Sequence, residues 1–271
     1  MVNGDPSQPR APRLFLDEPD LEDAQALSDA RSGDMFTIRG ASVHRLGRVL
    51  RLRRGDRVEI VHEAGDSLIE AELTRLGPDS VEARIANLRP IREPEPPFVW
   101  ICPSVVRAPR FDLLVEKTTE LGVHGIRPVR ATRSLAQSHG RERTFRWKRL
   151  VTEASEQCRR ERRPIVEAPI DLIDLVTAPV PADRPPDGYQ RLFASAREPD
   201  RRVSDAFADR PRPEIVELLV GPEGGFTETE ATAALDNGWL PVSLGPRPLR
   251  AETATIVATA LVQEALRAGA L

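Results

Sequence analysis

Several residue types are scarce in this sequence, and each scarcity excludes a class of protein. The chain of 271 residues has two cysteines, Cys102 and Cys158, and no Cys-x-x-Cys motif. We therefore expect neither a disulfide framework nor a cysteine-based zinc site. The four histidines, His44, His62, His124 and His139, do not stand at the spacing of metal ligands. No metal site is expected.

Long apolar runs are also absent. No stretch of ~18 apolar residues, the length that a membrane-spanning helix needs, occurs in the chain. The opening residues, MVNGDPSQPRAP, are polar and rich in proline, unlike a secretory signal peptide. We expect a cytoplasmic protein in which residues 1–12 form a disordered tail.

The chain as a whole carries no excess of positive charge, but short parts of it do. The net charge is −3 at pH 7, which alone does not indicate a nucleic-acid partner. Basic residues nevertheless cluster, and either a solvated surface or contacts with phosphates would explain the clusters. They comprise Arg48, Arg51, Arg53, Arg54 and Arg57, then Arg141, Arg143, Arg146, Lys148 and Arg149, then Arg159, Arg160, Arg162 and Arg163.

The first part of the chain has the pattern of a small β-barrel. Residues 56–62, 68–76 and 80–88 alternate between apolar and polar side chains and are separated by Gly-Asp or Gly-Pro turns. We also expect order to begin at 13–16, a strand at 35–39 and helices at 20–30 and 42–50. Residues 92–97 (REPEPP) contain three prolines, which predicts a linker and a domain boundary.

The second part alternates strands with helices, which predicts an α/β domain with a mostly parallel sheet. Helix 111–121 should turn Leu114, Val115 and Thr118 inward and end at Gly122. The other expected elements are strands at 98–102, 125–129, 164–166 and 191–194, and a helix at 146–160.

Two Gly-Pro loops near the C-terminus each follow a strand and open a helix. Strand 215–220 leads into GPEGGF, and the pair Thr227 and Glu230 forms a capping box for a helix over 228–236. Strand 240–244 leads into GPRPLRAET and a last helix, where Val257, Leu261 and Ala265 predict one apolar face. Glycines in such loops allow a close backbone approach or a positive φ.

Known catalytic and nucleotide motifs do not fit these loops. GPEGG lacks the Gly-Lys-Ser/Thr of a Walker A loop and the spacing of a dinucleotide site, and the chain has no Gly-x-Ser-x-Gly. A tight turn remains one interpretation. The other is a corner that holds an adenosine-like ligand by backbone groups, with Glu223 accepting from a ribose hydroxyl and the arginines 247 and 250 facing an anion.

The stretches LLVGPEGGFTETE and LGPRPLRAETA resemble the RsmE family, the bacterial 16S rRNA uracil-N3 methyltransferases of the SPOUT superfamily. Stretches 12–19, 42–60, 116–134 and 146–166 agree with the family in the same order. The chain departs from the family at two places. It has Glu116-Lys117 where the family often has Gln-Lys, and Arg-Ala-Pro-Arg at residues 107–110 where the family has a Lys-Gly-Asp-like segment.

The resemblance implies a fold and a cofactor. A PUA-like RNA-binding β-barrel would span residues 13–92, and a SPOUT methyltransferase domain with a trefoil knot would span 98–271. S-adenosyl-L-methionine would lie in the knot of a homodimer. Its expected contacts are Ala194, Ser195, Val220, Gly221, Pro222, Glu223, Gly224, Gly225, Leu244, Gly245, Pro248 and Leu249, with the loop around 194–196 as the third wall.

It also implies roles toward 16S rRNA in the small ribosomal subunit. We hypothesise that Arg250 stabilises the uracil anion and that Glu252 and Thr253 orient the base or the arginine. The expected RNA-binding residues are Arg13, His44, Arg48, Arg51, Arg110, Lys117 and Arg133. A SPOUT ribose 2′-O-methyltransferase and a non-catalytic RNA-binding protein remain as alternatives.

Overall fold

The chain folds into two compact units, seen in a computed structural model. The structure describes residues 10–23, 27, 29–134, 141–180, 188–195, 201–208 and 210–268. The first unit comprises residues 1–93 and 155–162, and the second comprises 94–154 and 163–271. The expected tail lies outside the described residues up to position 9, as does much of the expected helix at 20–30.

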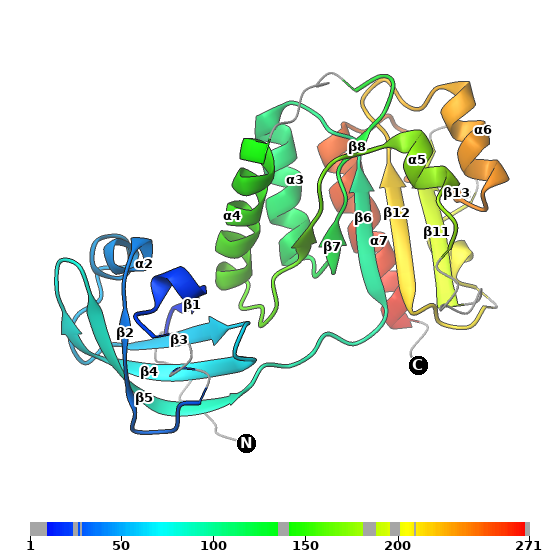
Figure 1. The fold of residues 1–271 in the computed structure, drawn as a ribbon. Coiled ribbons are helices and arrows are strands. Elements are labelled where there is room, and N and C mark those ends of the chain that lie inside the picture. The colour runs from blue at the N-terminus through cyan, green and yellow to red at the C-terminus, as the bar shows by residue number, and fades with distance from the viewer. Residues whose placement is uncertain are drawn as a thin grey trace. The chain divides into compact units, whose positions relative to one another are not determined.

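The first unit is built on a five-stranded sheet in the order β1-β3-β4-β5-β2 (Figure 1). Its strands are β1 (Arg13–Phe15), β2 (Met35–Ile38), β3 (Arg57–His62), β4 (Ser67–Leu76) and β5 (Val81–Pro90). All pairs are antiparallel except β1 with β3. The segment after β1 bonds to the outer edge of β2, through the Leu21↔Ile38 bridge, and this curls the sheet toward a barrel.

The expected helix at 42–50 is present but changes its winding. An α-helical turn, α2 (Ala41–His44), continues into a π-helical segment, η2 (Arg45–Val49). Val43 and Leu46 are buried in the same cluster as Ile60 and Ile69 of the sheet. The helix is thus fixed by its apolar side, and the basic residues of this segment stay at the surface.

The second unit contains a six-stranded, fully parallel sheet in the order β13-β11-β12-β6-β7-β9. These strands are β6 (Phe98–Pro103), β7 (Gly125–Ile126), β9 (Ile165–Val166), β11 (Tyr189–Ala194), β12 (Ile215–Val220) and β13 (Leu240–Val242). The predicted strand at 125–129 is divided, because β8 (Val129–Arg130) pairs with β10 (Ile170–Asp171) in a separate sheet. Pro128 stands between the two pieces and has no N–H for a ladder.

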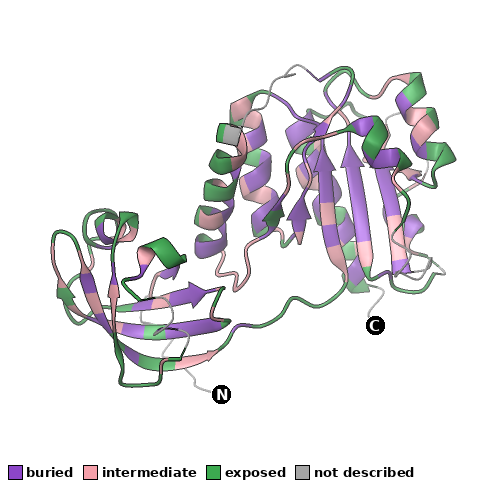
Figure 2. Cartoon of the chain, viewed as in Figure 1, coloured by how far each residue is buried: buried purple, intermediate pink, exposed green. Residues whose placement is uncertain are grey.

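Helices cover both faces of the parallel sheet (Figure 1). One face packs against α3 (Ala108–Glu120), α4 (Arg141–Gln157) and α7 (Ala251–Ala268), through a cluster that includes Ile101 and Leu218. The other packs against α5 (Leu172–Thr177) and α6 (Glu228–Asp236), through a cluster that includes Cys102 and Leu219. Neighbouring residues on a strand therefore point to opposite cores, which explains the continuous apolar runs and the buried strands in Figure 2. The α/β prediction is confirmed. No helix within the described part is long and apolar enough to cross a membrane.

The predicted apolar face of the last helix is wrong. Leu261 is 42% exposed, whereas Ala258, Val262 and Leu266 of α7 are buried. The buried stripe also contains Thr255, whose hydroxyl donates to the Ala251 carbonyl at 2.8 Å, so a residue that looks polar in the sequence is satisfied inside the helix. Helix α3 follows the prediction, because Leu114, Val115 and Thr118 are all buried.

Candidate functional site

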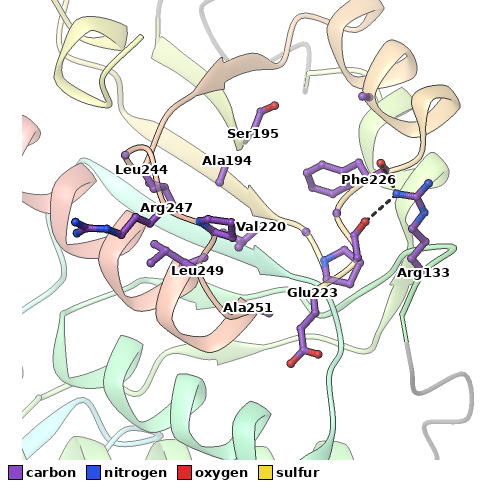
Figure 3. Close-up of a pocket in the computed structure, with 18 residues that line it drawn as sticks. Arg133, Ala194, Ser195, Val220, Glu223, Phe226, Leu244, Arg247, Leu249 and Ala251 are labelled. Atoms are coloured by element: carbon purple, nitrogen blue, oxygen red, sulfur yellow. Dashed lines mark hydrogen bonds between the residues drawn. The ribbon is translucent and has the colours of Figure 1, made fainter. Parts of the chain in front are cut away.

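A pocket of about 340 Å³ opens where three neighbouring strands of the parallel sheet end. The strands are β11, β12 and β13, and the residues that follow each of them form one wall (Figure 3). Because parallel strands share one carboxyl edge, loops far apart in the sequence meet there. Ala251 and Ala254 of α7 complete the lining.

Every residue expected to contact a cofactor lies in this lining. Ala194 ends β11 and Ser195 follows it, Val220 ends β12 and residues 221–225 follow it, and Leu244, Gly245, Pro248 and Leu249 come after β13. Ala196 lies outside the described residues. Arg247, expected to face an anion, also lies in the lining, as do residues that were not expected to contact the cofactor: Arg133, Phe226, Ala231, Ala251 and Ala254. Phe226 directly follows the GPEGG motif, and this position in the sequence could have indicated that it lines the same pocket.

The glycines of the first loop have clear physical reasons. A Cβ on Gly221 would lie 3.0 Å from the ring of Phe226, tighter than most Cβ contacts in proteins, so the ring would have to shift by a few tenths of an ångström. Gly225 has a φ of +66°, a conformation that side-chain-bearing residues rarely adopt. Of the two reasons proposed from the sequence, the positive φ is found at Gly225, whereas Gly221 is required by the neighbouring Phe226 ring.

The loop is fastened from both ends by hydrogen bonds. The predicted capping box is present, because Thr227 Oγ1 accepts from the Glu230 N–H at 3.2 Å and Glu230 Oε2 accepts from the Thr227 N–H at 2.7 Å. The second oxygen of Glu230 accepts from the Thr132 N–H at 2.7 Å. Burial opposes the charge on this carboxylate, but the backbone N–H groups of Thr132 and Thr227 outweigh it and keep the pKa of Glu230 below its ordinary value.

Arg133 ties the same loop to the segment after β8. Its Nη1 donates to the carbonyls of Gly224, at 2.8 Å, and Phe226, at 3.3 Å (Figure 3). Its side chain also fills the space where a Cβ of Gly224 would lie, 3.3 Å from Arg133 Cδ. The structure therefore places this expected RNA-binding residue in the pocket wall, with a guanidinium that is already engaged.

The side chain of Glu223 does not enter the pocket. In Figure 3 it points away from Val220 and Leu249. Its carboxylate forms an ion pair with Arg110 of α3. The expectation that this carboxylate faces a ribose does not match its position, because Arg110 holds it on the other side of the loop.

The residues expected to act in catalysis stand at the start of α7, beside the pocket rather than in its lining. Arg250 is exposed, and no ion pair joins it to a described residue. Glu252 is buried, with Oε1 at 3.7 Å from Arg110 Nε. Thr253 is exposed. The structure brings these three residues next to Ala251, which does line the pocket.

The expected RNA-binding residues fall into two groups. His44, Arg48 and Arg51 are exposed, and the described residues offer them no ion-pair partner. Arg13, in contrast, is 9% exposed and its Nε donates to Glu59 at 2.8 Å, so its assignment to RNA is corrected to a structural one. Lys117 is held between Glu116 and Glu120, at 2.7 and 2.9 Å, and the local charge there is negative.

The arginine clusters divide in the same way. Arg53, Arg54 and Arg57 join Arg48 and Arg51 as exposed residues whose side chains form no ion pair with the described part of the chain. In the two later clusters, many of the arginines form ion pairs with other side chains of the chain. The pairs are Arg146 with Asp112, Arg149 with Glu153, Arg159 with Glu59, and Arg162 with Asp66 and Glu93. The cluster at 48–57 is therefore the better candidate for contacts with phosphates.

Comparison with known proteins gives consistent matches over most of the chain. Residues 93–263 match the RNA methyltransferase domain family. Ribosomal RNA small subunit methyltransferase E of Synechocystis sp. is 30% identical over 233 residues, which cover 85% of this chain and 73% of that protein. The protein of the same name from Bacillus subtilis is 26% identical over 84% of this chain and 89% of its own length.

A solved structure agrees with both units. The crystal structure of a ribosomal RNA small subunit methyltransferase E from Neisseria gonorrhoeae, bound to S-adenosyl methionine, superposes with a TM-score of 0.77 and 28% identity. The match covers 94% of this chain and 98% of that one. The chain therefore belongs to the family of ribosomal RNA small subunit methyltransferases E (RsmE), and its second unit carries the RNA methyltransferase domain.

Proposed function

We propose that this protein transfers the methyl group of S-adenosyl-L-methionine to N3 of a specific uridine in the 16S rRNA of the small ribosomal subunit. The observation that supports this most is the pocket at the ends of β11, β12 and β13, in a chain whose Neisseria relative was solved with that cofactor. A protein that acts on rRNA would work in the cytoplasm. Residues 13–92, which belong to the first unit, would hold RNA as a PUA-like domain, and residues 98–271 would form the SPOUT domain.

The pocket fits the cofactor in size and in chemistry. Its volume of about 340 Å³ lies within the range of roughly 300–1,000 Å³ that small-molecule sites occupy. Apolar walls from Val220, Leu244 and Leu249 suit an adenine ring, and the loop backbone supplies N–H and C=O groups for its polar edges. The cofactor would supply an electrophilic methyl group on a positively charged sulfur.

We assign cofactor binding to the loops that follow the three strands. The residues are Ala194, Ser195, Val220, Gly221, Pro222, Glu223, Gly224, Gly225, Leu244, Gly245, Pro248 and Leu249. At Glu223 the assignment is to the backbone, because the carboxylate is turned toward Arg110. Phe226 and Arg133 keep the first loop in shape.

Arg250 is assigned the role of stabilising the uracil anion. Uracil N3 is a poor nucleophile until it loses its proton, and a carboxylate with an ordinary pKa of ~4 is a weak base for that step. A guanidinium beside the base would favour the deprotonated form electrostatically. Arg250 is exposed at the start of α7, next to the pocket, and makes no ion pair with the residues that are described. Glu252 and Thr253 would orient the base or this arginine.

The role of Arg250 is tested by Arg250→Ala. Loss of one such donor typically lowers kcat by about 10²–10³, and the affinity for the cofactor should stay the same. The measurements are single-turnover methylation and calorimetric titration with S-adenosyl-L-methionine. A variant with normal cofactor affinity and near-normal turnover would remove Arg250 from the chemistry.

A homodimer is proposed from the outer face of α7. Leu261 is 42% exposed on a helix whose inner stripe is already buried, and Leu113 of α3 is 41% exposed. Helices α3 and α7 pack together in the second unit, so both side chains belong to one helical layer. A second copy of the chain would cover these apolar side chains.

Nucleoside analysis separates the proposed function from its alternatives. Unmodified small ribosomal subunits are incubated with the protein and S-adenosyl-L-methionine, and the digested rRNA is analysed by mass spectrometry. We expect 3-methyluridine. A 2′-O-methylated nucleoside would instead indicate a ribose methyltransferase, and the absence of any methylation, together with no cofactor binding by calorimetry, would indicate an RNA-binding protein without catalysis.

A further inference from the structure

One arginine stands where helix electrostatics disfavour it. Arg110 lies in the first turn of α3, close to the positive end of the helix dipole, where acidic residues are preferred. That turn contains no acidic residue. Carboxylates from other elements must therefore offset the unfavourable field, and the elements that carry them indicate the role of this arginine.

Those carboxylates come from two elements of the candidate site. The Arg110 guanidinium pairs with Glu223, in the middle of the loop that follows β12, and its Nε lies 3.7 Å from Oε1 of Glu252, in the first turn of α7. One guanidinium thus joins the starts of α3 and α7 to the loop that walls the pocket. Figure 3 shows Glu223 turned to the side of the loop opposite the pocket lining.

Glu252 depends on this contact more than Glu223 does. Its side chain is 9% exposed, against 37% for Glu223. Its Oε2 is buried and has no hydrogen-bond partner in the described part of the chain. A buried carboxylate that loses its cation is strongly destabilising. Without Arg110, two negative side chains would also face each other across the same gap.

We propose that Arg110 is a positioning residue, which holds the 221–225 loop and the start of α7 in one geometry through Glu223 and Glu252. This rests on the proposed function, because it assigns Arg110 to cofactor binding and methyl transfer instead of to phosphate contacts. Arg110 does not line the pocket, so it acts through its two partners. With Glu223 held outside, the loop turns its backbone toward the ligand.

The test compares Arg110→Ala, Arg110→Lys and a matched control, Arg146→Ala. Arg146 pairs with Asp112, two residues after Arg110 in α3, at 2.6 Å, but lines no part of the pocket. For Arg110→Ala we expect the dissociation constant of S-adenosyl-L-methionine to rise ~10-fold or more, equivalent to about 1.4 kcal/mol. Arg110→Lys should recover part of the loss, because an ammonium keeps the charge but lacks the planar guanidinium fork. The control should keep its cofactor affinity.

A second pair of measurements separates positioning from contact with RNA. Arg110→Ala should leave the KM for the ribosomal subunit nearly unchanged, whereas a phosphate-binding residue would raise it. Adding Glu252→Gln to Arg110→Ala should restore cofactor affinity in part, because the neutral amide removes the uncompensated charge. If Arg110→Ala does not fold, Glu223→Gln replaces it and should weaken cofactor binding without changing that KM.

The contrary results are distinct. Unchanged cofactor affinity in Arg110→Ala, or a raised KM with normal cofactor affinity, would overturn the positioning role and leave the proposed function intact. A wild-type protein that binds no S-adenosyl-L-methionine would overturn the proposed function, and the positioning role with it.

Discussion

At the scale of single residues, side chains of one type have different roles in this protein. Arg48 is exposed without an ion pair among the described residues, whereas Arg13 is buried against Glu59. The glycines of the pocket loop are equally specific, since Gly221 faces the ring of Phe226 and Gly225 has a positive φ. The surroundings, and not the residue type, decide whether a side chain is available to a ligand.

Gly221→Ala tests the close approach in the loop. The added Cβ would lie 3.0 Å from the Phe226 ring, so the ring must shift and the pocket wall with it. We expect a weakening of S-adenosyl-L-methionine binding of about 10-fold, or roughly 1.4 kcal/mol, measured by calorimetry. Gly47→Ala is the control, because nothing lies within 4 Å of a Cβ there. Equal cofactor affinities for the two variants would argue against Gly221 being part of the wall of the cofactor site.

Glu161 predicts a pH dependence of stability in the first unit. Its hydrogen bond with the Arg89 side chain, helped by the Arg92 N–H and opposed by burial, lowers the pKa of Glu161 to about 2. Because the folded-state pKa lies below the unfolded value, its contribution is complete above the ordinary value of 4.5 and is lost as the pH falls toward 2. Glu161→Gln should cost about 1–3 kcal/mol at pH 7.

Chemical denaturation at pH 7 and pH 3 measures this effect. The difference in unfolding free energy between the wild type and Glu161→Gln should shrink at the lower pH. Glu93→Gln is the control, because Glu93 is 69% exposed in its pair with Arg162 and surface pairs contribute about 0–1 kcal/mol. A difference that does not change with pH would contradict the assignment.

At the scale of elements, the pattern of apolar residues predicted much of the fold. The strands β6, β11 and β12 and helix α6 lie where their apolar runs and capping box placed them. The strand at 125–129 was predicted as one piece, because periodicity does not show that Pro128 lets the chain leave one sheet for another. The face of α7 was misassigned because Thr255 and Thr259 are buried with hydroxyls bonded to their own helix.

Contacts between side chains far apart in the sequence could not be predicted either, because local patterns do not show them. The sequence places Arg110 and Glu252 far apart, and only the tertiary fold makes them an ion pair. The residues of the pocket lining were predicted from the family resemblance, and the parallel sheet explains why their loops meet, since its strands end at one edge. The trefoil knot stays a prediction from family resemblance.

The capping box predicts an effect of Thr227→Ala on both stability and binding. Loss of the cap should cost about 0.5–2 kcal/mol, and the freed loop should also bind the cofactor more weakly. Thr227→Ser keeps the hydroxyl and should be close to the wild type in both respects. Thermal unfolding and calorimetry measure the two effects. A loss of stability without any loss of affinity would show that the loop does not depend on its helix.

At the scale of the whole molecule, the outer face of α7 predicts the oligomeric state. Leu261→Glu places a charge on a side chain that is now 42% exposed, and it should convert a dimer into a monomer in light scattering. Leu235→Glu is the control, because Leu235 is 51% exposed on α6, outside this helical layer. A dimer that survives Leu261→Glu would place the interface elsewhere.

The arginines that form no ion pair with the described residues predict how the protein holds RNA. Replacing both Arg48 and Arg51 with alanine should weaken binding to the small subunit and lower the slope of log K against log salt by about 1 for each phosphate contact. Arg75→Ala is the control, because Arg75 is exposed but paired with Glu82 at 3.1 Å. Identical salt slopes for all variants would exclude this surface.

The most direct test of the central claim is reverse transcription across 16S rRNA after incubation of unmodified small subunits with the protein and S-adenosyl-L-methionine. A methyl group on uridine N3 blocks base pairing, so we predict one strong stop next to a single uridine. This stop should depend on the cofactor and should be weaker with Gly221→Ala at limiting cofactor. Full-length transcripts after incubation with the protein and the cofactor, identical to those obtained without the cofactor, would contradict the account.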